Sequence, residues 1–400
     1  MARVVVREKY LKKIRPYYGK SLVKVLTGQR RVGKSYMLKQ IKEELESLAP
    51  EANVIFIDLE RYDFDSIRTY QELHTFIKRQ SLAKQNILLI DEVQQINGFE
   101  RVLRSLLSEG NYDIYVTGSN SNIFSSELAT YLSGRQIEIY IQSLSFPEFL
   151  EFNGLSSSSS SLERYLKHGG LPYLSNLPND DELVFDYLRN IYATILYRDI
   201  VSRNQIRDIT FLENLNRFLA NNTGSVVSAT RISEFLKSQR QPKSVPVIIT
   251  YLDYLCSAYF VSRVRRQDII GKRIFETGEK YFFQDLGLRN SLTGFNPNDI
   301  AKIIENVVYN HLVYSGFNVS VGKDSDREVD FIAERQGEYA YYQCAYLLST
   351  ESVVEREFGN LLRIPDNYPK YVVSMDEFPV TSTYKGIKHI KLVDFFDALD

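Results

Sequence analysis

The chain has 400 residues, of which 44% are hydrophobic and 25% are charged, and its formal net charge is −1. These values are those of an ordinary globular protein with room for two or three domains, and they exclude the fibrous and disordered classes. Because the sequence has no signal-peptide pattern and no apolar run long enough to span a bilayer, we expect a soluble, cytoplasmic protein without a membrane partner.

A glycine-rich motif near the start of the chain lies between a strand pattern and a helical pattern. The apolar run Leu22 to Leu26 predicts a buried strand, and Tyr36 to Gln40 begins a helical pattern. Between them the chain fills every fixed position of G-x-x-x-x-G-K-[ST]. The residues of this motif are Gly28, Gln29, Arg30, Arg31, Val32, Gly33, Lys34 and Ser35. The order of strand, glycine-rich loop and helix predicts a phosphate-binding loop.

Each residue type at the fixed positions of this loop suits a nucleotide phosphate. Gly28 and Gly33 allow a tight turn and a close approach, so that successive backbone N–H groups point at phosphate oxygens. Lys34 supplies a positive charge for the β- and γ-phosphates. The hydroxyl group of Ser35 suits Mg²⁺, which prefers oxygen ligands. We therefore expect ATP and Mg²⁺ as cofactors.

Strand and helix patterns alternate after the loop. Asn53 to Asp58 predicts a second strand, and a helical region leads to a third buried run, Asn86 to Ile90. This run ends in Asp91, which is predicted to complete the Mg²⁺ shell, and in Glu92. Glu92 stands where a general base orients and deprotonates the water that attacks the γ-phosphate, which favours hydrolysis over transfer to an acceptor.

Another strand pattern, Ile114 to Thr117, ends in small polar residues. Ser119 and Asn120 are candidates for sensing the γ-phosphate, and the alternative is an ordinary strand-ending turn. Because strands alternate with helices, the N-terminal part is predicted to be an α/β domain with a parallel sheet covered by helices on both faces. The order of the strands within this sheet cannot be derived from the sequence.

Several motifs taken together resemble the AAA+ ATPases of bacteria and archaea that are usually called archaeal-type ATPases. They are the glycine-rich loop, Leu-Leu-Ile-Asp-Glu, Thr-Gly-Ser-Asn-Ser, Leu-Ser-Gly-Arg, Leu-Ser-Phe-Pro-Glu-Phe-Leu at residues 144–150, and His-Gly-Gly-Leu-Pro at residues 168–172. Within this resemblance, Arg135 occupies a position that suits an arginine finger, in cis or from a neighbouring subunit of an oligomer. The alternative for Arg135 is a solvated residue at the edge of a strand.

The resemblance covers nearly the whole chain and implies its organisation. We expect an AAA+ ATPase domain at residues 1–155, a helical connector or lid at 156–207, a winged helix-turn-helix at 208–295, and a C-terminal domain similar to PD-(D/E)XK nucleases at 296–400. The serines at 156–161 predict a flexible surface loop. In the connector, Arg198, Asp199 and Arg203 match a run that recurs in the resembled family. They suit either a link to the next domain or ion pairs on a helix surface.

The segment after the connector has winged-helix order. Helical patterns cover Phe211 to Ala220, residues 229–236 with Thr230 as N-cap, and Ser244 to Leu255. Two strand patterns then flank a turn around Gly271. Between residues 231 and 273 there are nine Lys or Arg and three Asp or Glu, so that contact with DNA through the winged helix is an alternative to a lid or signalling role.

The C-terminal part departs from a complete nuclease motif. Glu305 and Asp330 match the first two metal ligands, but Gln343 stands in place of an acidic residue and Ala345 in place of lysine. Unless Lys323 or Glu328 substitutes, we expect an inactive domain that serves as a recognition or docking module for a protein partner.

The prediction from the sequence is an Mg²⁺-dependent ATPase whose nucleotide cycle switches the arrangement of the winged helix and the C-terminal domain. The alternatives are an ATP-modulated DNA-binding regulator and an ATP-dependent nuclease. Cys256 and Cys344 are too few for a disulfide framework or a four-ligand zinc site, and the histidines occur singly. We therefore expect no metal besides the nucleotide-bound Mg²⁺.

Overall fold

The computed structural model describes residues 5–82, 84–121, 132, 134–269, 278–324, 327–376 and 383–399. The chain divides into two compact units, the first made of residues 1–143 and 257–259 and the second of residues 144–256 and 260–400. The expected boundary at residue 155 is therefore twelve residues late. The reason is that Leu144, Phe146 and Phe149 are buried in the core of the second unit, with which they pack.

The first unit is built on a five-stranded parallel sheet. Its elements are α1 (Glu8–Ile14), β1 (Val23–Thr27), α2 (Lys34–Leu48), β2 (Asn53–Asp58), α3 (Tyr70–Gln80), β3 (Asn86–Asp91), α4 (Phe99–Glu109), β4 (Tyr112–Gly118) and β5 (Gln136–Tyr140). The strand order is β2-β3-β4-β1-β5, so that β4 lies between the strand before the glycine-rich loop and the strand that ends in Asp91. This is the AAA+ order.

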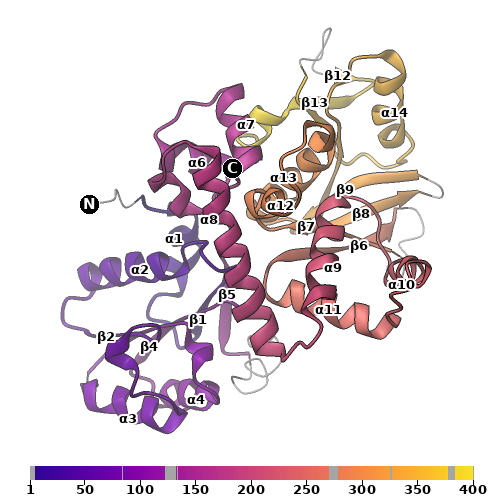
Figure 1. Ribbon diagram of the computed structural model, residues 1–400. Helices are drawn as coiled ribbons and strands as arrows, with labels where there is room; N and C mark the ends of the chain where they lie inside the picture. The colour runs from indigo at the N-terminus through magenta and orange to yellow at the C-terminus, as the bar shows by residue number, and fades with distance from the viewer. Residues whose placement is uncertain are drawn as a thin grey trace. The chain divides into compact units, whose positions relative to one another are not determined.

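Helices cover both faces of this sheet, as the alternating pattern predicts. Figure 1 shows α2 on one side of the sheet and α3 and α4 on the other. Every residue of β1, β3 and β4 is buried, which explains why these strands are mostly apolar without alternation. Apart from Asp91, their charged residues are Lys24 of β1 and Asp113 of β4, which form a buried ion pair at 2.5 Å. In such a sheet the functional loops gather at the carboxyl ends of the strands. The glycine-rich loop after β1 and Asp91 at the end of β3 therefore lie at the same edge of the sheet.

The second unit begins with helices. They are α6 (Phe146–Asn153), α7 (Ser159–His168), α8 (Asp181–Thr194), a π-helical segment (Ile195–Ser202), α9 (Ile209–Asn221), α10 (Ala229–Ser238) and α11 (Val245–Ser257). Among the described helices, none combines the length and the apolar character needed to cross a bilayer. The run of Arg198 and Asp199 lies in the π-helical segment, in which Asp199 is buried at 3% exposure.

Two local expectations for these helices are wrong, and both involve serine. The serines at 156–161 are not all loop: Ser158 is the N-cap of α7, and its hydroxyl accepts a hydrogen bond from the N–H of Ser161 at 3.2 Å. The N-cap of α10 is Ser228 rather than Thr230, and its hydroxyl accepts from the N–H of Arg231. In each case the serine directly before the helix accepts a hydrogen bond from a backbone N–H that would otherwise be unpaired.

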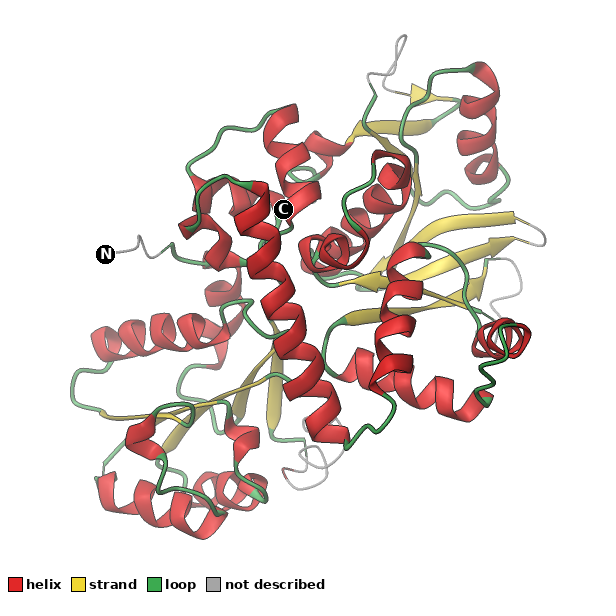
Figure 2. Cartoon of the chain, viewed as in Figure 1, coloured by secondary structure: helices red, strands yellow, loops and turns green. Residues whose placement is uncertain are grey.

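An eight-stranded sheet forms the rest of the second unit. Its elements are β6 (Val261–Asp268), β7 (Glu279–Phe283), α12 (Leu286–Thr293), α13 (Ile300–Tyr314), β8 (Asn318–Asp324), β9 (Arg327–Arg335), β10 (Glu338–Cys344), α14 (Glu351–Leu362), β11 (Lys370–Ser374), β12 (Thr383–Tyr384), β13 (Ile387–Lys391) and α15 (Leu392–Phe395). The strand order is β12-β13-β11-β10-β9-β8-β6-β7. Figure 2 shows these strands in yellow, with helices packed beside them.

The expected division at residues 295 and 296 passes through this sheet. The antiparallel pair β6 and β7 precedes the division, yet β6 continues the sheet by pairing with β8 in parallel. Val264 and Phe282 of the pair are buried in the same core cluster as residues of α13, β9 and β10. The two expected domains therefore share one sheet and one core. The turn expected around Gly271 lies outside the described residues.

Helix α12 is buried at the centre of the second unit, where it contacts α7, α8 and α9. Its N-cap, Asp285, accepts a hydrogen bond from the N–H of Gly170 at 2.8 Å, in the His-Gly-Gly-Leu-Pro motif. A Cβ atom on Gly287 would lie 1.9 Å from the carbonyl oxygen of His168. Close backbone packing against α12 therefore explains the small residues at this turn.

Candidate functional site

The glycine-rich loop lies between β1 and α2, at the carboxyl edge of the parallel sheet. The side chain of Lys34 is buried at 4% exposure, and its Nζ donates to the carbonyl oxygens of Gly28 at 3.0 Å and Gln29 at 2.9 Å. Gly33, the N-cap of α2, has φ 99° and supplies no side-chain cap. The amide N–H groups of the first turn of α2 are thus left for an anion.

Gly28 is required by packing within the domain. Its φ is 143°, and a Cβ atom there would lie 2.1 Å from the carbonyl oxygen of Ile141. The sequence interpretation assigned this glycine to a close approach of the nucleotide, whereas the contact that excludes a side chain comes from the segment after β5. Arg31 also has positive φ, at 71°, and its side chain is exposed.

Asp91 connects the glycine-rich loop to the end of β3. It is 3% exposed, and its carboxylate accepts a hydrogen bond from the hydroxyl group of Thr117. Burial raises the pKa of Asp91, and the hydroxyl groups of Ser35 and Thr117 oppose the rise. Ser35 is therefore near enough to Asp91 to affect its carboxyl group, as expected of two residues predicted to ligate Mg²⁺.

Glu92 lies beside Asp91 in a left-handed backbone conformation, with φ 53°. Its carboxylate accepts hydrogen bonds from Ser119 at 3.3 Å and from the side-chain amide of Gln94. Burial alone would raise the pKa of Glu92, but the positive charges of Lys34 and Arg30 outweigh it and hold the pKa below its ordinary value. Glu92 is thus a buried carboxylate that stays ionised at neutral pH.

Three residues of this site were missed by sequence reasoning. Thr117 accepts from the backbone N–H of Glu92 at 2.8 Å and donates to Asp91, so that it fixes both acids. Gln94 bridges Glu92 and Ser119. Arg7 donates to the carbonyl oxygens of Val32 at 3.1 Å and Gln142 at 3.0 Å beneath the loop. Thr117 was visible in its motif, whereas Arg7 has no local signal in the sequence.

The other predicted residues of the site occupy two regions. Ser119 and Asn120 are buried at the carboxyl end of β4. Ser119 contacts Glu92 there. Arg30 is 8% exposed and lies 3.6 Å from Glu60. The side chain of Gln29 is 1% exposed, and within the described part of the chain neither of its amide atoms has a hydrogen-bond partner.

Arg135 is not brought together with these residues. It precedes β5, and its carbonyl oxygen accepts from the N–H of Val23, the first residue of β1. The glycine-rich loop follows Thr27 at the opposite end of the same strand. Four steps of a strand span about 13 Å, which exceeds the reach of an arginine side chain. This geometry excludes a role for Arg135 in cis and leaves the role from a neighbouring subunit as a prediction.

The residues present fit a nucleotide with its magnesium ion. Lys34 and the uncapped start of α2 provide positive charge and N–H donors for phosphates, and Ser35 and Asp91 offer adjacent oxygen ligands for Mg²⁺. Mg²⁺ commonly binds through one or two protein ligands together with phosphates and water. In the described part of the chain, no group of three or more His, Cys, Asp or Glu is arranged to hold a metal ion by itself.

A second charged cluster occupies the position of the nuclease-like motif. Lys280 of β7, whose side chain is 2% exposed, forms ion pairs with Glu305 of α13, with Glu328 at 2.7 Å and with Asp330 of β9 at 3.7 Å. Burial alone would lower the pKa of Lys280, but the three carboxylates outweigh it and raise the pKa. The ammonium group thus stays charged among these acids.

Two of the carboxyl groups around Lys280 have strongly shifted pKa values. Burial and the neighbouring Asp330 raise the pKa of Glu305, although Lys280 opposes the rise. Burial likewise raises the pKa of Asp330 against the effect of Lys280. The side-chain amide of Gln343 donates a hydrogen bond to Glu357 at 3.0 Å rather than to Glu305 or Glu328. The lysine of the cluster therefore comes from a strand outside the nuclease-like motif, and neither Lys323 nor the place of Ala345 supplies it.

Two known protein families match separate parts of the chain. Residues 20–150 match an AAA domain, and residues 159–299 match a domain of unknown function, DUF8612. An uncharacterised protein of Haemophilus influenzae is 35% identical over 400 residues, which cover 98% of each chain. The uncharacterised protein MJ1544 of Methanocaldococcus jannaschii is 30% identical over 351 residues, which cover 84% of this chain and 77% of that protein. The chain belongs to the family of these two proteins.

The chain thus joins an AAA domain, which supports an ATP-binding, ATPase-like function, to a domain of unknown function. Two solved structures that are similar to this chain are distant from it. The ORC1 protein of Aeropyrum pernix in complex with DNA has 12% identity and a TM-score of 0.35, covering 73% of this chain and 93% of that chain. AMPPCP-bound DnaA of Aquifex aeolicus has 16% identity and a TM-score of 0.33, covering 50% of this chain and 70% of that chain.

Proposed function

We propose that this protein is an Mg²⁺-dependent ATPase that hydrolyses ATP to ADP and phosphate. The observation that carries the proposal is the position of Thr117 between the two acids, because its hydroxyl group donates to Asp91 and accepts from the N–H of Glu92. The nearby hydroxyl group of Ser35 opposes the rise in the pKa of Asp91, which supports a shared Mg²⁺ site for these two oxygen groups. Adjacent to them, Glu92 is a buried carboxylate held ionised by Lys34 and Arg30.

Each side chain then has a definite task. Lys34 binds the β- and γ-phosphates in place of the carbonyl oxygens of Gly28 and Gln29 that it now contacts. Glu92 orients a water molecule and accepts its proton as the oxygen attacks the γ-phosphorus and the bond to the β-phosphate oxygen breaks. Ser119 and Gln94 hold the carboxylate of Glu92 in position. Mg²⁺, when bound, neutralises charge that develops on the phosphate oxygens.

Lys34→Ala is expected to weaken ATP binding by at least about tenfold, because it removes a charged donor to two phosphate groups. Titration of a fluorescent ATP analogue into the protein measures this loss. Lys39→Ala is a matched control, since Lys39 lies on the same helix but is exposed. Equal affinities for Lys34→Ala and Lys39→Ala would contradict a phosphate-binding role for Lys34.

A mixing experiment tests Arg135. We expect Arg135→Ala and Lys34→Ala each to lose most ATPase activity, and an equimolar mixture of the two to regain part of it. Recovery is expected because Arg135 lies too far from Lys34 of its own chain and acts, in this proposal, from a neighbouring subunit. Full activity of Arg135→Ala alone, or no recovery in the mixture, would remove the arginine finger and leave Arg135 as an edge residue of β5.

We propose that the output of the cycle is a change in the arrangement of the second unit, with a winged helix as one component. The order α9, α10, α11, β6 and β7 supports this. Further support is the backbone pairing of Val227 with Glu279, at 2.8 and 2.9 Å, because it attaches the segment between the first two helices to the strand pair. The C-terminal strands and helices serve as a recognition surface for a protein partner.

The DNA-binding alternative receives less support from the distribution of charge. Arg263 pairs with Asp253 and Glu279, and Lys243 pairs with Asp208, so that part of the basic excess is neutralised within the protein. Helix α11, which would enter the major groove in a helix-turn-helix, contains no Lys or Arg. Exposed cations remain on α10, and Lys272 and Arg273 lie outside the described residues.

The nuclease alternative is also less supported. In such an enzyme the carboxylates bind a divalent ion, whereas in this chain the Lys280 ammonium group lies among Glu305, Glu328 and Asp330. Gln343 is a neutral amide engaged with Glu357. An ion-paired structural cluster accounts for these contacts, and the domain is proposed to be inactive.

A further inference from the structure

A cavity of about 310 Å³ lies in the second unit, beside α7 and the segment that leads into α8. Its size is at the lower end of the range for small-molecule sites. The lining residues are Leu155, Ser160, Ser161, Glu163, Arg164, Lys167, His168, Asn179 and Asp181. Leu155 is the one apolar residue in this set, and the polar groups of the others can contact a ligand.

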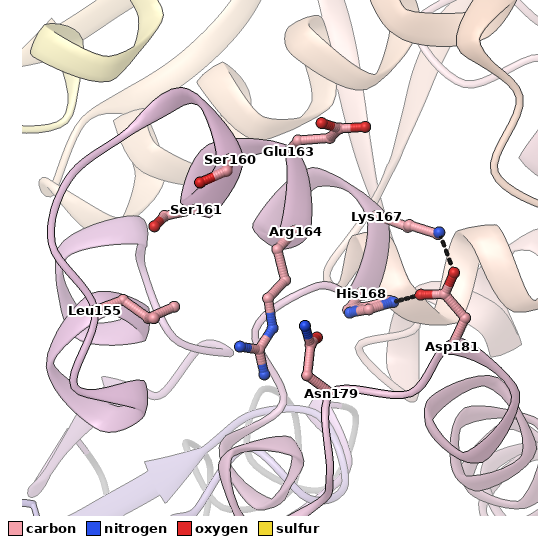
Figure 3. Close-up of a pocket in the computed structure, with 9 residues that line it drawn as sticks. All are labelled: Leu155, Ser160, Ser161, Glu163, Arg164, Lys167, His168, Asn179 and Asp181. Carbon is pink, nitrogen blue, oxygen red and sulfur yellow. Dashed lines mark hydrogen bonds and ion pairs between the residues drawn. The ribbon is translucent and has the colours of Figure 1, made fainter.

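Two of the basic side chains in the cavity are already satisfied. Figure 3 shows Lys167 and His168 both directed at Asp181, and the ring Nε2 of His168 lies 2.7 Å from that carboxylate. Burial lowers the pKa of His168 although Asp181 opposes the fall, so the imidazole is neutral at pH 7. Lys167 and Asp181 cancel in charge. This group therefore forms one wall without net charge.

Arg164 differs from these neighbours because no carboxylate among the described residues balances it. It donates to the side-chain oxygen of Asn153 at 3.2 Å and lies over the ring of Phe149, and its Nε is buried without a hydrogen-bond partner within the same residues. Burial lowers the pKa of Arg164, and no neighbouring charge counters this. In Figure 3 the carboxylate of Glu163 points away from the guanidinium group. A partly buried cation of this kind is stabilised by an anion.

We propose that the cavity binds a small molecule bearing a phosphate group, with Arg164 as its principal anchor. A guanidinium group presents a planar fork of donors that matches phosphate oxygens. Figure 3 shows the carboxamide of Asn179 beside this fork. Asn179 is exposed, and in the part of the chain that the structure describes it has no hydrogen-bond partner, so its amide is available as a second donor.

Phosphate suits this cavity better than a carboxylate because donors approach from several directions. Ser160 and Ser161 line the cavity at the start of α7, where the N–H of Ser161 is satisfied by Ser158 but the N–H of Ser160 has no partner within the helix. A tetrahedral phosphate group has oxygens for Arg164, for Asn179 and for the serine side together. A planar carboxylate has only two oxygens. The site is separate from the glycine-rich loop and does not depend on the ATPase proposal.

The experiment is a calorimetric titration of inorganic phosphate at constant ionic strength. The full-length chain carries Lys34→Ala in every arm, so that the glycine-rich loop contributes little. We expect Arg164→Gln to weaken phosphate binding at least about tenfold. Arg189→Gln is the matched control, because Arg189 of α8 is exposed and paired with Asp186, and it is expected to bind like its parent. Equal affinity in the Arg164 variant and its parent would overturn the proposal.

Two further arms separate phosphate recognition from lost packing and from general anion binding. Arg164→Gln also removes packing on Phe149, so Asn179→Asp provides a variant that adds a negative charge at an exposed position without removing packing. It is also expected to weaken phosphate binding at least about tenfold, while circular dichroism stays that of the parent. Unchanged affinity in Asn179→Asp, or acetate binding as tightly as phosphate, would contradict a phosphate site in this cavity.

Discussion

Replacing Glu92 with glutamine is expected to leave ATP binding intact and to lower ATP turnover by at least about 100-fold, the usual contribution of a general base. The amide keeps the shape of the side chain and its contacts with Ser119 and Gln94, but it cannot accept the proton of the attacking water. Steady-state phosphate release, together with nucleotide binding measured separately, distinguishes the two effects.

Glu109→Gln is a suitable control for this experiment, because Glu109 is a carboxylate of α4 whose partner is Lys78. It is expected to hydrolyse ATP at the parental rate. The lowered pKa of Glu92 adds a second expectation: the base stays ionised above its ordinary pKa near 4.5, so turnover between pH 6 and pH 8 shows no acid limb from this residue. Parental turnover by Glu92→Gln would exclude Glu92 as the base.

Replacing Lys280 with methionine is expected to destabilise the protein by about 3 to 5 kcal/mol, the usual cost of removing one partner from a buried ion pair. Methionine retains most of the length of the lysine side chain, so packing changes little. The loss arises because Glu305 and Asp330 remain buried without the ammonium group that pairs with them, whereas Arg266 lies 4.0 Å from Glu328 only. Denaturant unfolding of the whole chain, followed by circular dichroism, measures the change.

The destabilisation by Lys280→Met is expected to be larger at pH 8 than at pH 5. The pKa values of Glu305 and Asp330 are already raised by burial, and without the ammonium group they rise further. A raised pKa means that the folded state binds more protons than the unfolded state, so stability falls as pH increases from the ordinary pKa of a carboxyl group toward the folded value. A destabilisation that is independent of pH would contradict this electrostatic account.

Lys302→Met is the matched control for Lys280→Met. Lys302 lies on α13 and also pairs with an acid, Asp299 at 3.5 Å, but its side chain is 39% exposed. Exposed pairs contribute little to stability, so this variant is expected to unfold close to the parental midpoint. Adding Glu305→Gln to Lys280→Met is expected to recover part of the lost stability. Similar losses for the two lysine variants would show that burial of the Lys280 cluster carries no special cost.

The phosphate-binding loop and the acids of β3 could be predicted from the sequence because their signals are local. A continuous apolar run followed by Gly28 to Ser35, and a second run followed by Asp91, fix the strand ends at which the site forms. The family match of residues 20–150 to an AAA domain confirms this part of the fold. The roles of Glu92 and Ser119 in catalysis stay predictions.

The remainder depended on contacts between distant parts of the chain, which spacing does not encode. Arg7 supports the loop from more than twenty residues away, and Lys280 enters the nuclease-like cluster from a strand that precedes the motif. For Arg135 the sequence was misleading, because its neighbours in the chain resemble a catalytic motif. Arg135 lies at the amino end of β5, at the end of the sheet away from the glycine-rich loop. Tertiary contacts decided the cases of Arg7 and Lys280, and the end of the strand at which it lies decided the case of Arg135.

The continuation of one sheet from the β6–β7 pair into β8 has a consequence for dissecting this protein. A fragment that starts at residue 296 would begin its sheet at β8, with a row of unpaired backbone groups where β6 binds. It would also lack Phe282 of the common core and the only cation that balances Glu305 in the described cluster. The two parts of the second unit, before and after residue 296, are therefore not expected to fold separately. Limited proteolysis is expected to release the second unit as one fragment.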